Sequence, residues 1–241
     1  MSTARQLAAL LVDRQPCVVL TGAGISTESG IPDFRSATGI WAEVDPFEVA
    51  SIQAFRRDPT RVWDFYRTRI RLLLEAEPNP GHVALAALER RGLVQAIVTQ
   101  NIDTLHSRAG SRDVVEVHGS IRAAECPSCL WTEETAGVLA QLEERSAPLC
   151  VHCAEILKPG VTLFGELLPS VAIERATDLA RGAALMLVVG STLEVWPVAG
   201  LPLEARSLAV VNRGRTTLDH RADLKIDGAA GETLTAIVNA L

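Results

Sequence analysis

The chain has 241 residues, of which 48% are apolar and 22% are charged, a composition typical of one large globular domain or of one domain with a small insertion. Its formal net charge of −6 excludes a general electrostatic attraction to nucleic acid or to an anionic membrane, and no apolar run is long enough to cross a membrane. We therefore expect a cytoplasmic protein that binds neither nucleic acid nor membrane. A monomer is a separate expectation, on which composition and charge do not bear.

The first expected element is an amphipathic helix over residues 2–14, which reads as part of the fold and not as a signal peptide. Residues 18–21 follow as a strand that runs directly into the glycine turn 22–24. Glycine lets the backbone approach a ligand closely, and a helix beginning near Ser26 would direct its free N–H groups at a phosphate there. Thr27 stands where the Rossmann fingerprint has its third glycine, so the turn matches a phosphate site only in part.

The stretch after this turn carries a more specific signal. A second turn at residues 29–32 leads to Asp33, Phe34 and Arg35, and residues 36–44 continue as a polar loop. An acid, an aromatic ring and a guanidinium beside a phosphate cradle predict a loop that closes over a ligand.

The remainder of the chain alternates between helical and extended patterns. Alternating strands and helices predict an α/β fold, with a Rossmann-like parallel sheet covered by helices on both faces. The expected helices cover residues 46–55, 60–75, 80–90, 171–181 and 232–241, and the expected extended segments cover residues 94–99, 114–117, 156–164, 185–189, 208–211 and 224–226.

Polar residues and glycines recur just beyond the carboxyl ends of these strands. Ligands of open α/β sheets bind in the crevice outside those ends, and five such signals are difficult to attribute to turn formation alone. The five signals are Gly22, the pair Gln100 and Asn101, His118, the pair Gly190 and Ser191, and Asn212.

Four of the five cysteines form two C-x-x-C pairs, with twenty residues between Cys129 and Cys150. This is the spacing of a zinc ribbon, in which four thiolates close a tetrahedron around one structural Zn²⁺. A reducing compartment favours this interpretation over two disulfides. His152 is expected to point away from the metal, and Cys17 to be a buried small hydrophobic residue. The expected zinc ligands are Cys126, Cys129, Cys150 and Cys153.

Six motifs follow one another in a fixed order: GAGISTESGIPDFR from Gly22, TQNIDTLHSRAG from Thr99, VHGS from Val117, the two C-x-x-C pairs, KPGVTLFGE from Lys158 and VVGSTLEVWP from Val188. Their order and spacing closely resemble the sirtuin family of NAD-dependent protein deacylases over essentially the whole chain. The resemblance implies a transferase that removes acyl groups from protein lysines with consumption of NAD, yielding nicotinamide and O-acyl-ADP-ribose.

The resemblance also implies one catalytic domain over residues 1–241. NAD and an acyl-lysine protein or peptide substrate would meet in a cleft between its parts. Those parts would be a Rossmann-like large domain of residues 1–35, 76–120 and 160–241, a helical cofactor-loop module of residues 36–75, and a zinc-binding module of residues 121–159.

Carried over by position, the resemblance assigns most of the strand-end residues to NAD. The turn and loop after the first strand would hold the dinucleotide, the Gln100 segment its ribose and nicotinamide amide, and the Gly190 and Asn212 segments its phosphate and adenosine end. The expected NAD-binding residues are Gly22, Ala23, Gly24, Glu28, Asp33, Phe34, Arg35, Trp41, Gln100, Asn101, Ile102, Asp103, Gly190, Ser191, Thr192, Asn212 and Ala230.

His118 is implied as the catalytic general base. An imidazole with a pKa near neutrality suits activation of a ribose hydroxyl, whereas a zinc ion saturated by four thiolates cannot activate water. Extended segments 161–166 and 193–195 would sandwich the substrate peptide by strand addition, which tolerates varied sequences. The expected peptide-side residues are Val161, Phe164, Gly165, Glu166 and Val195.

Tyr66 and Arg69 lie three residues apart on an expected helix and therefore share a face. A phenol hydroxyl beside a guanidinium can bind a carboxylate, and arginine suits this because its fork is bidentate. This Tyr-x-x-Arg pair resembles sirtuins that remove succinyl and malonyl groups, and the small Ala37 fits a pocket widened for a longer acyl chain. The alternative is that Arg69 is one of several surface arginines and Tyr66 belongs to the core.

Three departures from the family pattern concern fine cofactor contacts and not the class. Residues 190–192 invert the commoner Gly-Thr-Ser order, Lys158 stands where arginine is usual, and the usual proline before Thr216 is missing. A plain deacetylase, an ADP-ribosyltransferase and a non-enzymatic NAD-sensing zinc module remain alternative functions.

Overall fold

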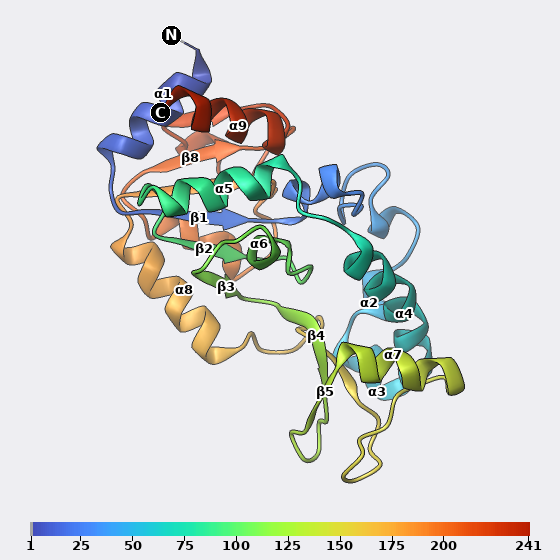
Figure 1. The fold of residues 1–241 in the computed structure, drawn as a ribbon. Coiled ribbons are helices and arrows are strands. Elements are labelled where there is room, and N and C mark those ends of the chain that lie inside the picture. Colours follow the sequence, from blue (N-terminus) through green and yellow to red (C-terminus); the bar gives the residue numbers. More distant parts are fainter. Residues whose placement is uncertain (1) are drawn as a thin grey trace.

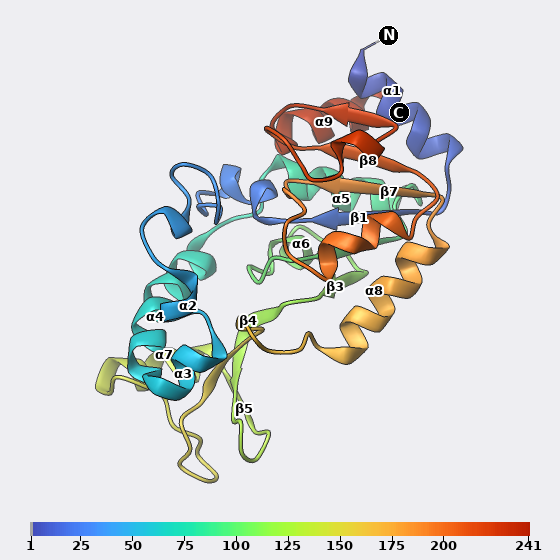
Figure 2. The same ribbon diagram turned by 180° about the vertical axis from the view of Figure 1, so that it is seen from behind.

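Six parallel strands form the central sheet of this computed structural model, which describes residues 2–241 (Figures 1 and 2). In chain order they are β1 (Cys17–Thr21), β2 (Ala96–Thr99), β3 (Val114–Glu116), β7 (Leu185–Val189), β8 (Leu208–Val211) and β9 (Leu224–Ile226). Their spatial order is β3-β2-β1-β7-β8-β9, so the direction of connection reverses between β1 and β7. Loops diverge at such a switch point and leave a crevice beyond the strand ends.

Alternate side chains of the buried strands face two separate layers of helices. Val19 of β1 packs in the core beneath α1, α5 and α9, whereas Val18 and Leu20 pack in the core beneath α8. A parallel sheet covered on both faces needs such aliphatic strands, and the expected Rossmann-like architecture is confirmed. The covering helices are α1 (Thr3–Asp13), α5 (Pro80–Arg90) and α9 (Ala230–Ala240) on one face and α8 (Ser170–Gly182) on the other.

A smaller lobe lies beyond the β3 side of the sheet (Figure 1). Fully buried Trp63 donates its indole N–H to the carbonyl oxygen of Leu157 at 2.7 Å, so the helices and the cysteine-bearing segment share one core. The lobe contains α2 (Pro46–Val49), α3 (Ile52–Arg57), α4 (Pro59–Glu75), α7 (Thr135–Glu144) and an antiparallel sheet of β4 (Gly119–Glu125), β5 (Thr132–Glu134) and β6 (Lys158–Val161). One further short helix, α6 (Leu105–Arg108), follows β2.

No α-helix begins near Ser26, so that expectation is wrong. The chain forms two short 3-10 turns instead, Ala23–Ile25 and Thr27–Ser29. The second turn stops at Gly30, whose left-handed φ of 81° ends helical geometry after a single turn. The N–H groups beside the glycine turn therefore belong to tight turns and carry no long helix dipole.

The single helix expected over residues 46–55 is also wrong. Helix α2 ends at Val49, and Ser51 caps the start of α3, because its Oγ accepts a hydrogen bond from Ala54 N at 3.0 Å. Phe164 holds the break open from far along the chain: its N–H donates to Ala50 O at 2.8 Å, and its carbonyl accepts from Ile52 N at 3.0 Å. Long-range pairing thus overrides local helical pattern. Within residues 2–241, no helix is long and apolar enough to span a membrane.

Gly24 and Gly190 approach so closely that neither has room for a side chain. Gly24 N donates to Gly190 O at 2.8 Å, and a Cβ added to Gly190 would lie 2.6 Å from the carbonyl carbon of Gly24. Gly190 also has a left-handed φ of 63°. Direct backbone contact therefore fixes the turn after β1 against the turn after β7.

We expect Gly190→Ala to lower the free energy of unfolding by at least about 2 kcal/mol, because the new Cβ adds both backbone strain and a steric clash. Gly182→Ala is the matched control, since a Cβ there meets no neighbouring group within 4 Å and alanine favours the end of α8. Chemical denaturation measures both free energies of unfolding. Equal values for the two variants would contradict the prediction.

Candidate functional site

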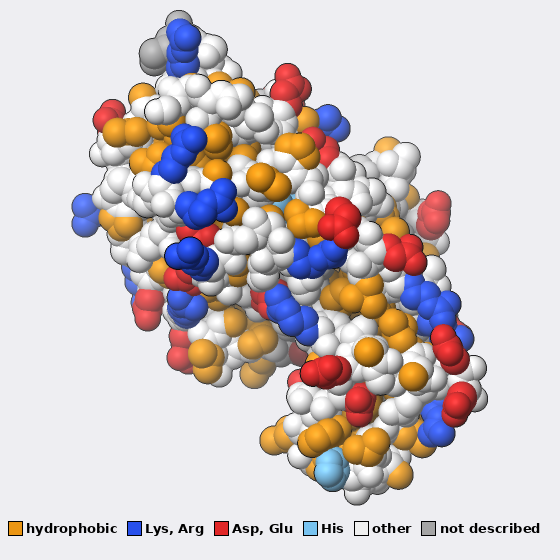
Figure 3. All heavy atoms as spheres, in the orientation of Figure 1, with side chains coloured by type: hydrophobic (Ala, Val, Ile, Leu, Met, Phe, Trp, Pro, Cys, Tyr) orange, Lys and Arg blue, Asp and Glu red, His pale blue; other side chains and the backbone are white. Residues whose placement is uncertain are grey.

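A cleft of about 990 Å³ opens between the carboxyl edge of the large sheet and the small lobe. It is lined by the turn after β1, the loop that follows it, the ends of β2, β7 and β8, helix α4 and residues 161–166. On the face shown in Figure 3, basic and acidic side chains are interspersed over both parts of the molecule. The cleft is therefore distinguished by its shape and its particular polar groups, and not by one sign of charge over the whole face.

The switch-point end of the cleft is polar and closely built. Gln100 Nε2 donates to Ser191 Oγ at 3.0 Å, and Leu193 N donates to the same oxygen at 3.2 Å. Glu28 Oε1 accepts a hydrogen bond from Gly231 N at 2.9 Å, which ties the turn after β1 to the start of α9. Glycine backbone and small hydroxyl side chains leave space for a phosphate group to approach N–H donors.

Asn101, Asp103 and Ser26 form a buried hydrogen-bonded network at the base of the cleft. Ser26 Oγ donates to Asp103 Oδ2 at 2.6 Å, and Asn101 Nδ2 donates to Ser26 Oγ at 3.2 Å and to Gly22 O at 3.1 Å. Asp103 is 4% exposed and Asn101 is 8% exposed, yet both line the cleft. Such fixed amide and carboxylate groups are suited to recognise a carboxamide.

Two buried histidines stand behind this network. Burial lowers the pKa of His82 to about 4, outweighing the nearby Asp103 carboxylate, and burial holds the pKa of His106 well below its usual range. Both rings are therefore neutral at neutral pH. His82 lies in the first turn of α5, where its Nδ1 accepts a hydrogen bond from Asn79 N at 3.3 Å. His106 Nε2 lies 2.9 Å from Thr21 Oγ1 at the end of β1.

His118 lies where the chain leaves β3 and enters β4, and it lines the cleft. Its Nδ1 is 3.0 Å from the carbonyl oxygen of Gln100, which can only accept, so Nδ1 carries the proton and Nε2 keeps its lone pair. Burial lowers the pKa of His118, outweighing this hydrogen bond, and the charge of Arg35 lowers it further. A neutral imidazole held in one tautomer can accept a proton in the cleft.

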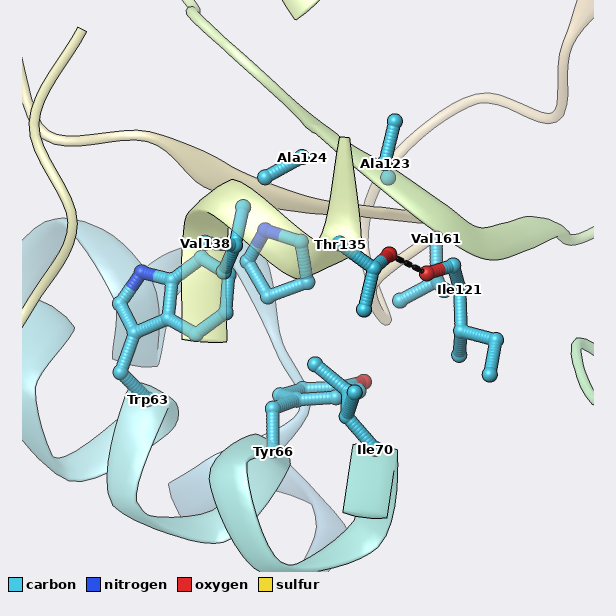
Figure 4. Close-up of a pocket in the computed structure, with 11 residues that line it drawn as sticks. Trp63, Tyr66, Ile70, Ile121, Ala123, Ala124, Thr135, Val138 and Val161 are labelled. Carbon is cyan, nitrogen blue, oxygen red and sulfur yellow. Dashed lines mark hydrogen bonds between the residues drawn. The ribbon is translucent and has the colours of Figure 1, made fainter. Parts of the chain in front are cut away.

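Tyr66 and Arg69 lie on the cleft side of α4. Tyr66 is 6% exposed and separates the cleft from a small cavity under α7, toward which Trp63 and Tyr66 project in Figure 4. Burial raises the pKa of the Tyr66 hydroxyl, so the group remains a hydrogen-bond donor. The Arg69 guanidinium lies 5.4 Å from the ring centre of Phe34 and 5.2 Å from that of Phe65. Among residues 2–241, it has no ion-pair or hydrogen-bond partner.

Lys158 fixes the turn on the opposite wall of the cleft. Its nearly buried ammonium lies 2.9 Å from Glu125 Oε1 and 3.2 Å from Glu166 Oε2. Glu166 also accepts a hydrogen bond from Leu163 N at 2.8 Å, which closes the turn. The lysine that replaces the usual arginine is thus fully paired, and it links the lobe sheet to the cleft wall.

All the residues expected to bind NAD line this cleft, as do all the expected peptide-side and acyl-side residues except Ala37. Ala37 is exposed, because the chain turns tightly from Ser36 to Gly39 through a 2.8 Å backbone hydrogen bond. The segment 193–195 is not extended throughout, since Leu193 has a left-handed φ of 59°.

Several lining residues were not singled out from the sequence. Ser26 follows the glycine turn, and its place in that motif could have identified it. Phe65 precedes Tyr66 on α4, and a helical pattern alone does not tell which of two neighbouring aromatic residues faces a cleft. Arg213 and Arg215 follow Asn212, so the strand-end rule could have found them.

The four paired cysteines come together at the far end of the lobe. Their sulfur atoms all lie within 4.8 Å of one another, and the shortest separation is 3.4 Å. A tetrahedron with Zn–S bonds of about 2.3 Å has edges of about 3.8 Å, whereas a disulfide needs about 2.05 Å. The cluster therefore fits a structural zinc ion with every position filled by sulfur. Its members are Cys126, Cys129, Cys150 and Cys153.

His152 and Cys17 take no part in this cluster. The His152 ring packs edge-on against Trp131, with ring centres 4.3 Å apart. Cys17 is fully buried in β1, and burial raises the pKa of its thiol to about 12, which excludes a nucleophilic role at neutral pH.

The chain resembles known proteins over nearly its whole length. The Sir2 family profile matches residues 22–197. The NAD-dependent protein deacylase of Thermococcus kodakarensis is 43% identical over 238 residues, which is 96% of this chain and 93% of that protein. NAD-dependent protein deacylase 2 of Archaeoglobus fulgidus is 44% identical over 239 residues, which is 97% of this chain and 94% of that protein.

The fold of this chain matches solved Sir2 structures over nearly its whole length. A Sir2 complex with p53 peptide and NAD⁺ has a TM-score of 0.91 and 39% identity, covering 99% of this chain and 98% of that one. A Sir2 complex with deacetylated p53 peptide and 3′-O-acetyl ADP-ribose has a TM-score of 0.94 and 39% identity, covering 98% and 97%.

We expect one zinc ion per chain. The variant Cys150→Ser should lose this ion, and its melting temperature should fall by more than about 5 °C, because Cys150 is part of the lobe core. Cys17→Ala is the matched control and should keep its zinc. Metal analysis and thermal unfolding measure the two effects. Stoichiometric zinc in Cys150→Ser, or unchanged melting after metal loss, would contradict a structural role.

Proposed function

The chain belongs to the Sir2 family and is an NAD-dependent protein deacylase, and we propose that it acts preferentially on lysines that carry succinyl or malonyl groups. Both acyl groups end in a carboxylate, which an acetyl group lacks. Relatives of similar identity are named either deacylase or deacetylase, so kinship leaves the acyl preference open. The proposal is supported by the chemistry of two side chains in the cleft.

The proposal depends on the position of the Arg69 guanidinium, which lines the cleft without an anionic partner among residues 2–241. Burial lowers its pKa, but arginine keeps its charge in proteins, and a half-buried charge without an anionic partner is costly. The neighbouring Tyr66 hydroxyl is available as a second donor. An acyl carboxylate bound between the two groups would accept from both and would neutralise the guanidinium.

The other cleft residues would then act on NAD and the acyl-lysine. When bound, NAD supplies a labile bond between ribose and nicotinamide. Ser191 and the glycine turn would hold the diphosphate, and Asn101 and Asp103 would hold the nicotinamide carboxamide. His118 would take a proton from a ribose hydroxyl at Nε2, while its Nδ1–H stays on the carbonyl of Gln100.

The substrate peptide would lie between residues 161–166 and residues 194–195. Both segments line the cleft, and residues 163–166 are fixed by Glu166. Backbone pairing would set the register of the peptide with little dependence on its sequence. The enzyme would therefore distinguish its substrates mainly by their acyl group.

The activity should persist below the ordinary titration range of histidine. Because the pKa of His118 is lowered in the folded protein, the base stays deprotonated to lower pH, and the acidic limb of kcat/KM should fall below pH 6.5. A pH profile with a succinyl-lysine peptide measures this limb. His118→Ala should abolish the activity, and an acidic limb centred above pH 7 would contradict the assignment.

Arg69→Met should reduce kcat/KM for a succinyl-lysine peptide by about 10- to 100-fold, because a charge-assisted hydrogen bond contributes about 1.5–3 kcal/mol. The same substitution should change kcat/KM for the acetyl-lysine version by less than about threefold. Arg71→Met is the matched control, since Arg71 lies on the same helix, is exposed and does not line the cleft. An equal fall in kcat/KM for both peptides would contradict the proposal.

A further inference from the structure

Residues 33–44 form a self-contained loop on the rim of the cleft. Its backbone folds back on itself, as in the 3.0 Å hydrogen bond from Trp41 N to Phe34 O. Within residues 2–241, every hydrogen bond of this loop has both partners inside it, apart from the 3.1 Å ion pair between Arg35 and Glu194. The loop is therefore held against the rest of the molecule mainly by side-chain packing.

That packing is an aromatic cluster that includes Arg69. Phe34 stacks on Trp41 at 5.1 Å, and Trp41 stacks on Phe65 of α4 at 6.2 Å and meets the edge of Phe164 at 6.3 Å. The Arg69 guanidinium contacts both phenyl rings, one from the loop and one from α4. This single side chain thus bridges the loop and the helix.

A guanidinium can serve two partners at once. Its flat face stacks on aromatic rings, while its edge donates hydrogen bonds in a fork that matches a carboxylate. A partner for its edge would further restrict the rotamers that are open to this long side chain. A carboxylate held by Arg69 and Tyr66 would confine the guanidinium to the stacked position.

We propose, on the basis of the proposed function, that Arg69 couples recognition of the acyl carboxylate to docking of the NAD-binding loop. A succinyl or malonyl group fixes Arg69 against Phe34, and the docked loop then presents its residues to the dinucleotide. An acetyl group makes no such contact and leaves the loop as it was. Because coupling free energies are reciprocal, the dinucleotide in turn strengthens binding of the acidic acyl-lysine by the same factor.

The test measures the dissociation constant of ADP-ribose, an unreactive stand-in for NAD, by titration calorimetry. The protein is saturated beforehand with one peptide in its succinyl-lysine or acetyl-lysine form. We expect ADP-ribose to bind about fivefold more tightly to the succinyl-peptide complex than to the acetyl-peptide complex, a ratio within the range of a cation–π contact.

Phe34→Leu should bring this ratio to near one, because leucine fills the space without offering a π face. The variant should still bind the succinyl peptide more tightly than the acetyl peptide, since Tyr66 and Arg69 remain. Phe65→Leu provides a second variant on the helix side. Phe47→Leu is the matched control, because Phe47 is exposed and contacts Phe164 but not Arg69, and it should keep the fivefold ratio.

The outcomes separate the coupling from the acyl preference. Equal ADP-ribose affinities in the two peptide complexes of the unmodified protein, with the succinyl peptide still preferred, overturn the coupling and leave the proposed function intact. No preference for the succinyl peptide at all overturns both. A ratio that survives Phe34→Leu and Phe65→Leu also overturns the coupling through these rings.

Discussion

Backbone contact between the turns after β1 and β7 is the constraint on which the cleft depends. A side chain at Gly24 or Gly190 would force the two strand ends apart, and the polar groups around Ser191 and Gln100 would no longer meet. The same contact places the turn after β1 beside the ends of β7 and β8. The two halves of the sheet therefore form one binding site because glycine allows their turns to touch.

Charge is distributed unevenly across this site. The buried side holds Asp103 among neutral histidines, whereas Arg35 and Arg69 lie on the loop and helix that face it. An anionic ligand therefore meets its cationic partners at the rim, and an uncharged amide meets the fixed network beneath. The arrangement separates the part of the cleft that can bind charge from the part that can position a neutral group.

Much of the architecture could be predicted from the sequence, because the central strands are short aliphatic runs and their polar ends cluster at one edge of the sheet. The cysteine spacing likewise located the metal cluster. The break at Ser51 could not be predicted, because Phe164 imposes it from a distant part of the chain. The burial of His82 has a similar origin: nothing near it in sequence indicates that it will face Ser26 and His106. The missed strand β4 pairs with the nearby β5 and also with β6, which lies more than thirty residues further on, beyond the reach of local patterns.

The shared core of the small lobe has a consequence for how the protein is made. Trp63 belongs to a segment synthesised well before Leu157, and the whole of β2 and β3 is translated between them. A helix that emerges from the ribosome without its packing partner exposes its apolar face, and at ordinary elongation rates the wait is on the order of seconds. No continuous fragment of the chain contains this core without also containing β2 and β3, so the lobe can be completed only after these two strands at one side of the large sheet have been synthesised.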